Sequence, residues 1–113
     1  MAKVEIDINL KDEIIKKFKD HSKEIFRQMQ SLEKNPQKGK ELGRVGGIVI
    51  KEIRYESFRF YFITDGFKLR IMDQSKLVDS LIKFVRMSNK KDQQKTINEI
   101  KEILIKVGLR GFE

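Results

Sequence analysis

The chain has 113 residues, and 25 lysines and arginines against 17 aspartates and glutamates give it a net charge of +8. This length predicts a single domain spanning residues 1–113, since two separate cores would not fit. The absence of cysteine excludes disulfides, thiolate metal sites and thiol nucleophiles, and a single histidine makes a zinc site close to excluded. We therefore expect no metal and no cofactor.

The distribution of apolar residues argues against a membrane protein. The sequence contains no apolar run long enough for a spanning helix. Its first residues, MAKVEIDINL, carry charges where a signal peptide would have an apolar region. We therefore expect a cytoplasmic protein with no membrane partner.

The excess positive charge is concentrated in two windows. Residues 34–60 carry seven basic and three acidic groups, and residues 81–101 carry six and two, so each window contributes +4. Charge that only aids solubility would be spread along the chain. Two concentrated windows favour a surface that binds a polyanion, and nucleic acid is the commonest one in the cytoplasm.

The N-terminal third predicts a strand followed by helix. The segment KVEIDI, residues 3–8, alternates apolar and charged side chains, which is the period of a half-buried strand. From Leu10 to Leu32 apolar residues recur at spacings of three, four and seven, which predicts an amphipathic helix with Asn9 as its N-cap. Both one long helix and a helical hairpin, with Ser22 capping the second helix, fit this pattern.

The central part predicts a loop and then three short strands. Residues 34–47, KNPQKGKELGRVGG, contain the only proline and four glycines, and this composition predicts a loop. The strands are expected at Ile48–Arg54, Phe58–Thr64 and Phe67–Met72. The Asp-Gly pair at residues 65 and 66 is the strongest hairpin signal in the chain.

The C-terminal part predicts one more strand and a helix. Leu81–Met87 has the composition of a strand, and Asp92–Val107 carries a second helical stripe that ends at Gly108 as a C-terminal cap. The expected fold class is α+β. It comprises a small antiparallel β-sheet, an N-terminal helix or helical hairpin, and a C-terminal helix packed on one side.

The stretch RYESFRFYF, residues 54–62, places two arginines opposite each other. If residues 56 and 57 form a two-residue turn, Arg54 lies directly across from Arg59. The next hairpin would place Tyr61 opposite Arg70, with Lys68 on the same face. Alternation assigns a core face to Val49, Ile53, Tyr55, Phe58, Phe60, Phe62, Phe67, Leu69 and Ile71. It assigns the other face to Glu52, Arg54, Arg59, Tyr61, Lys68 and Arg70, with Ile48, Ile50 and Ile63 towards one end.

Two interpretations of this charged face stay open. In one, Glu52 neutralises the arginines and the whole face is solvated. In the other, the arginines bind phosphate, since like charges directly opposite are destabilising and guanidinium groups match phosphate oxygens in geometry. The neighbouring tyrosine and the basic window favour phosphate binding.

Residues 31–63, SLEKNPQKGKELGRVGGIVIKEIRYESFRFYFI, resemble the RelE/ParE toxin superfamily, whose members run "L..NP..G..L" into a hairpin ending "R...YR..Y.I". Residues 81–100, LIKFVRMSNKKDQQKTINEI, resemble its HigB-type branch. The resemblance covers residues 10–105 in element order. It implies the toxin of a toxin–antitoxin pair, an endoribonuclease that cuts mRNA on the ribosome without metal and is neutralised by an acidic antitoxin protein.

The resemblance also implies residue roles. Arg59 matches the arginine that holds the scissile phosphate, Arg54 a flanking contact, and Arg86 a third catalytic group; Glu52 is a possible base or only a salt-bridge partner. The further candidate nucleic-acid-binding residues are Lys51, Tyr61, Lys68, Arg70, Lys90 and Lys91. By alternation, Ile82 and Phe84 lie on the same face of the strand as Arg86. Both faces of this strand would then be largely apolar, so the face to which the Arg86 side chain points stays open.

One departure from the family pattern keeps other functions open. Many active members carry a histidine or tyrosine near the C-terminal end of the sheet, where this chain reads RMSNKKDQQK. The alternatives are a relative that binds RNA or ribosomes without cutting, a ParE-like inhibitor of DNA gyrase, and a generic basic nucleic-acid-binding module. The only histidine, His21, is expected on a helix surface or boundary.

Overall fold

The computed structural model describes residues 3–64 and 81–112 and shows an α+β fold, as predicted. Strands β1 (Lys3–Ile6), β2 (Lys40–Val45), β3 (Ile48–Tyr55), β4 (Phe58–Thr64) and β5 (Leu81–Asn89) form one sheet in the order β1-β5-β4-β3-β2. Strand β1 runs parallel to β5, whereas the other neighbours are antiparallel. The sheet is therefore mixed, not antiparallel as expected.

The N-terminal helical segment is a hairpin. Helix α1 (Ile8–Phe18) is followed by a 3₁₀ turn, η1 (Lys19–His21), then by α2 (Ser22–Gln30) and a second 3₁₀ turn, η2 (Ser31–Glu33). The cap residues differ from those expected. Asp7, not Asn9, caps α1 through its carboxylate, and Ser22 donates its hydroxyl hydrogen bond to the Ile14 carbonyl, not to the start of α2.

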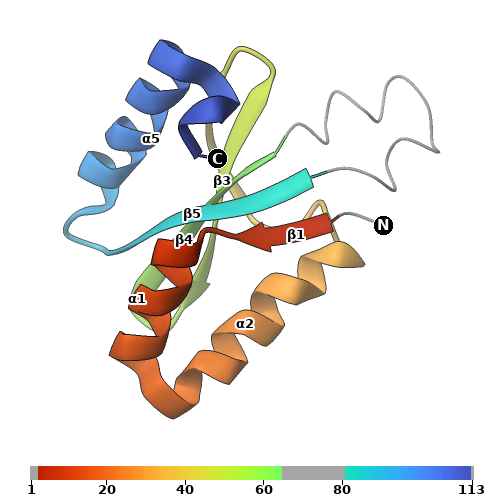
Figure 1. Ribbon diagram of the computed structural model, residues 1–113, viewed down its shortest axis with the longest axis vertical. Helices are drawn as coiled ribbons and strands as arrows, with labels where there is room; N and C mark the ends of the chain where they lie inside the picture. Colours follow the sequence, from red (N-terminus) through yellow and green to blue (C-terminus); the bar gives the residue numbers. More distant parts are fainter. Residues whose placement is uncertain (1–2, 65–80, 113) are drawn as a thin grey trace.

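The C-terminal helix packs on the opposite face of the sheet, which corrects the expectation of helices on one side. Helix α5 (Gln93–Val107) and the 3₁₀ turn η3 (Gly108–Phe112) cover one face, and the α1–α2 hairpin covers the other (Figure 1). Gly108, the expected C-terminal cap, has φ +66°.

Two apolar clusters follow from this arrangement, one on each face. The hairpin face buries Leu10, Ile14, Ile25, Met29, Ile53, Phe60, Phe62, Ile82 and Phe84. The α5 face buries Ile50, Tyr61, Ile63, Val85, Ile97, Ile100, Leu104 and Phe112. The apolar positions on the charged face of the hairpin β3–β4 therefore mark a second core under α5.

Strand β2 lies within the segment predicted to be a loop. It pairs with β3 with a register shift between Glu41 and Gly43, and Gly46, at φ +60°, turns the chain into β3. The residues of this edge strand, which include a glycine and three charged residues, do not alternate between apolar and polar, and none of them is buried, so the sequence did not predict a strand here. The predicted strand Phe67–Met72 and the Asp-Gly turn before it lie outside the described residues.

The β3–β4 hairpin has the predicted register. Tyr55 pairs with Phe58 and Arg54 with Arg59 around the turn at Glu56 and Ser57, where Glu56 takes φ +55°. Both edges of β4 are occupied, by β3 and by β5. Within the described ranges, no helix has the length and apolarity needed to cross a membrane.

Candidate nucleic-acid interface

Strands β3, β4 and β5 bring six polar side chains onto the face covered by α5. One row across the strands is Arg54, Arg59 and Ser88, and the next is Glu52, Tyr61 and Arg86. We call these six residues the arginine face. The structure therefore unites Glu52, Arg54, Arg59 and Arg86, the four predicted catalytic candidates, on one surface.

Arg86 reaches this face because of a bulge. The register of β4 and β5 shifts between Tyr61 and Phe62, so that Val85 is passed over and Arg86 pairs with Tyr61. Ile82 and Phe84 belong to the cluster on the opposite face, so the neighbours expected from simple alternation were wrong. The guanidinium of Arg86 donates to the Val85 carbonyl at 2.8 Å and lies 5.6 Å from the Phe112 ring centroid.

Glu52 is the buried counter-ion of the two opposed arginines. Its side chain is 1% exposed; Oε1 lies 3.4 Å from Arg54 Nη2 and Oε2 lies 3.7 Å from Arg59 Nε. The carboxylate offsets the repulsion that two arginines would otherwise feel across the hairpin. The cluster of Glu52, Arg54 and Arg59 retains a net charge of +1.

The two arginines differ in access to solvent. The Arg54 side chain is 53% exposed, whereas that of Arg59 is 8% exposed. Arg59 also donates through Nη1 to the Ser57 carbonyl at 3.4 Å. In the free protein Arg54 is thus the member of the pair that a phosphate group can reach.

Tyr61, although it belongs to the arginine face, is fully buried. Its hydroxyl lies 2.7 Å from Ser88 Oγ, and Ser88 in turn donates to the Asn89 carbonyl. Burial is the main cause that raises the Tyr61 pKa, so the phenol stays neutral at physiological pH. The ring borders the core and has no free surface for stacking on a base.

Of the remaining nucleic-acid-binding candidates, those that the structure describes lie outside the arginine face. Lys51 pairs with Phe62, so it lies on the hairpin face, where it donates to the Gln37 carbonyl at 2.9 Å. Lys90 and Lys91 are exposed between β5 and α5. Lys68 and Arg70 lie outside the described residues. His21 is exposed in η1, as expected for a boundary residue.

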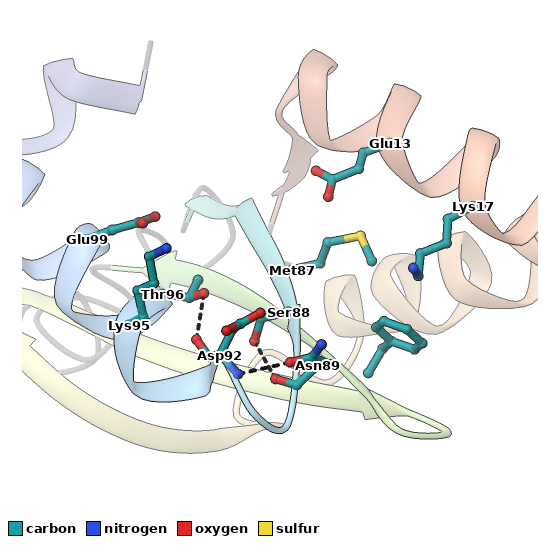
Figure 2. A pocket seen from close by; sticks show the side chains of 10 residues that line it. Glu13, Lys17, Met87, Ser88, Asn89, Asp92, Lys95, Thr96 and Glu99 are labelled. Atoms are coloured by element: carbon teal, nitrogen blue, oxygen red, sulfur yellow. Dashed lines mark hydrogen bonds between the residues drawn. The ribbon is translucent and has the colours of Figure 1, made fainter.

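A groove of about 270 Å³ lies beside the arginine face, along the end of β5. Figure 2 shows Glu13 and Lys17 of α1 on one side and Lys95 and Glu99 of α5 on the other. Its remaining lining residues are Phe58, Met87, Ser88, Asn89, Asp92 and Thr96. Since β1 pairs with β5 only as far as Phe84, this end of β5 has only β4 as a strand neighbour in the described part of the chain.

The groove carries charges of both signs. Lys17 Nζ lies 4.8 Å from the Phe58 ring centroid, and Asn89 Oδ1 accepts from the Asp92 backbone N–H at 2.9 Å. Ser88 belongs both to this groove and to the arginine face. Sequence reasoning missed Ser88, because only the bulge places it beside Arg59, and no residue pattern marks the bulge.

Chemically, the arginine face suits anion binding. Among residues 3–64 and 81–112, no three histidine, cysteine or carboxylate side chains come together as a metal site would require. Guanidinium groups match the oxygens of a phosphodiester in both charge and geometry. Comparison of the chain with protein-family models, with curated proteins and with solved structures found no match in any of the three.

Proposed function

We propose that the protein binds RNA through the arginine face and acts as the toxin of a toxin–antitoxin pair, a ribosome-dependent, metal-independent mRNA endoribonuclease. One observation carries the proposal: Arg54, Arg59 and Arg86 occupy adjacent rows of one sheet face with a single carboxylate, Glu52, among them. The guanidinium groups of Arg54 and Arg86, which have solvent access, favour a phosphodiester ligand. The resemblance to the RelE/ParE superfamily supplies the class of reaction.

In this reaction the ribose 2′-oxygen attacks the adjacent phosphorus and the bond from phosphorus to the 5′-oxygen breaks. A proton leaves the 2′-hydroxyl and another reaches the departing 5′-oxygen. Guanidinium groups stabilise the extra negative charge on the phosphate oxygens in the transition state. Arg54 and Arg86, the arginines with solvent access, are the groups that we assign to this task.

The test is expression from a tight inducible promoter, with mapping of mRNA 5′-hydroxyl ends on translating ribosomes. We expect growth arrest and new ends at codons in the ribosomal A site. Arg54→Gln should abolish both effects. The matched control is Arg27→Gln on α2, an exposed arginine on the opposite side of the sheet, and it should change neither.

A second candidate function is RNA or ribosome binding without cleavage. The burial of the Glu52 and Arg59 side chains, 1% and 8% exposed, favours it, because buried groups cannot exchange protons with a substrate unless they move. Intact mRNA with preserved ribosome binding would establish this candidate in place of the nuclease. Loss of both cleavage and RNA binding would reject both.

We further propose an acidic antitoxin as the protein partner and the cytoplasm as the location. The net charge of +8 and the two basic windows favour a partner with acidic residues. Co-expression of a small acidic protein from the neighbouring reading frame should restore growth. Continued arrest in the presence of that protein would argue against the pairing.

A further inference from the structure

The carboxylate of Glu52 is shared by two arginines in unequal positions. Arg54 approaches Oε1 through both Nε and Nη2, each at 3.4 Å, from a half-exposed position. Arg59 approaches Oε2 from a buried position, with Nε at 3.7 Å. A charged pair with optimal geometry has N···O distances near 2.7–2.9 Å. Both arginines therefore lie farther from Glu52 than in an optimal ion pair.

Two buried polar atoms in this cluster lack hydrogen-bond partners. They are Glu52 Oε2 and Arg59 Nε, the facing atoms of the buried pair. Unsatisfied buried polar atoms are rare in folded proteins and cost free energy. Both atoms would be satisfied if the Glu52–Arg59 pair closed by less than 1 Å, and the competing attraction of Arg54 for the same carboxylate opposes that movement.

We propose that Glu52 competes with RNA phosphate for Arg54. In the free protein Arg54 is held by Glu52. When a phosphodiester binds, Arg54 turns to the phosphate, and Glu52 closes on Arg59 to form the missing hydrogen bond. Glu52 keeps a buried counter-ion throughout, so the exchange never leaves an isolated charge in the interior. This inference rests on the proposed RNA binding.

The exchange assigns different roles to the opposed arginines. Arg54 contacts the phosphate, whereas Arg59 and Glu52 are positioning residues that act through Arg54. The family resemblance had suggested Arg59 for the scissile phosphate. The 8% exposure of the Arg59 side chain, against 53% for Arg54, favours the reverse assignment.

The experiment compares the affinity of the wild-type protein and of Glu52→Gln for a short single-stranded oligoribonucleotide, measured by fluorescence anisotropy at fixed low salt. Removing the competing charge raises the charge of the cluster from +1 to +2. We expect binding about two- to fivefold tighter, because this ratio of affinities corresponds to the free energy of a half-exposed ion pair. Glu102→Gln, which removes an exposed carboxylate paired with Lys106 on α5, should leave the affinity unchanged.

The outcomes separate this inference from the proposed function. If the wild-type protein binds RNA and Glu52→Gln binds equally or more weakly, the competition is wrong and the RNA-binding proposal stands. If neither protein binds RNA, the proposed function itself fails, and the inference fails with it.

A second measurement uses the wild-type protein, in case Glu52→Gln does not fold. Side-chain NMR follows the Nε–H signals of Arg54 and Arg59 during titration with the same oligoribonucleotide. Both signals should move, and the Arg59 Nε–H should exchange more slowly with water as it bonds to Glu52. A saturated complex in which the Arg59 signal is unchanged would overturn the exchange.

Discussion

At the scale of single residues, burial decides what each charge on the arginine face contributes. Glu52 and Arg59 are both almost fully buried, whereas the Arg54 side chain is half in solvent. Removing one partner of a buried pair leaves an uncompensated charge, which costs far more than the pair itself contributes. An exposed partner is replaced by water at little cost.

We therefore predict unequal effects on stability from the same substitution. Arg59→Gln should lower the free energy of unfolding by roughly 1–3 kcal/mol, because the buried Glu52 carboxylate then keeps only its half-exposed partner Arg54. Arg54→Gln should lower it by less than about 1 kcal/mol. Urea unfolding followed by circular dichroism measures both. Equal losses of unfolding free energy in the two variants would show that burial does not set the contribution of each arginine to stability.

The phenol of Tyr55 offers a titration test. Its hydroxyl donates to Glu24 Oε2 at 2.5 Å, and this hydrogen bond is the main cause that raises the Tyr55 pKa to about 12 from 10.0. A pKa raised by folding gives stability that is complete below pH 10 and is lost as pH rises towards 12.

We expect the ¹³Cζ NMR signal of Tyr55 to titrate near pH 12. Glu24→Gln should move this midpoint down towards 10, because the neutral amide no longer penalises the phenolate. The stabilisation by this hydrogen bond, measured as the difference in free energy of unfolding between wild type and Glu24→Gln, should be present below pH 10 and be lost as the pH rises towards 12. A wild-type midpoint near 10 would show that the hydrogen bond does not persist in solution.

At the scale of elements, the break between α1 and α2 depends on one strained residue. Lys19 has φ +48° and ψ −115°, a conformation that side chains with a Cβ rarely adopt. This backbone conformation turns the chain between α1 and α2, so that both helices cover the same face of the sheet (Figure 1). Glycine would adopt this conformation without the steric cost.

Lys19→Gly should therefore raise the free energy of unfolding by about 1 kcal/mol, the lower end of the cost of such a conformation. The matched control is Lys16→Gly, the same substitution at an exposed position inside α1, which should lower it by about 1 kcal/mol. Thermal or urea unfolding of the two variants measures the difference. Destabilisation by both substitutions would contradict a strained turn at Lys19.

The same elements show what local patterns can and cannot predict. Alternation in the β3–β4 hairpin predicted the pairing of Arg54 with Arg59, because a two-residue turn fixes the register. The bulge at Val85 was not predictable, since it depends on how β5 fits β4 and not on its own residues. The exposed edge strand β2 was missed because it lacks an apolar alternation. The C-terminal helix was predicted, but its position on the second face of the sheet was not, because Ile50 and Ile63 were assigned to a charged face.

At the scale of the whole molecule, folding joins the two basic windows. One contains β2, β3 and the start of β4, and the other contains β5 and the start of α5. Because β4 pairs with β5, residues far apart in the chain become neighbours on one face, where Arg54 and Arg59 lie beside Ser88 and Arg86. Arg86 of the second window thus joins Arg54 and Arg59 of the first, whereas Lys51 lies on the opposite face of the sheet.

These arginines predict RNA binding that weakens as the salt concentration rises. Phosphate contacts from Arg54 and Arg86 to a single strand release about 1.4 counterions, so affinity should fall roughly sevenfold between 50 and 200 mM salt. Arg54→Gln should reduce the slope of log K against log salt by about 0.7, because one phosphate contact is lost, and Arg27→Gln should leave it unchanged. Anisotropy titrations at four or five salt concentrations give these slopes. A flat dependence would mean that RNA is not held through phosphate contacts, and an equal effect of the two substitutions would mean that the general positive charge, and not the arginine face, holds it.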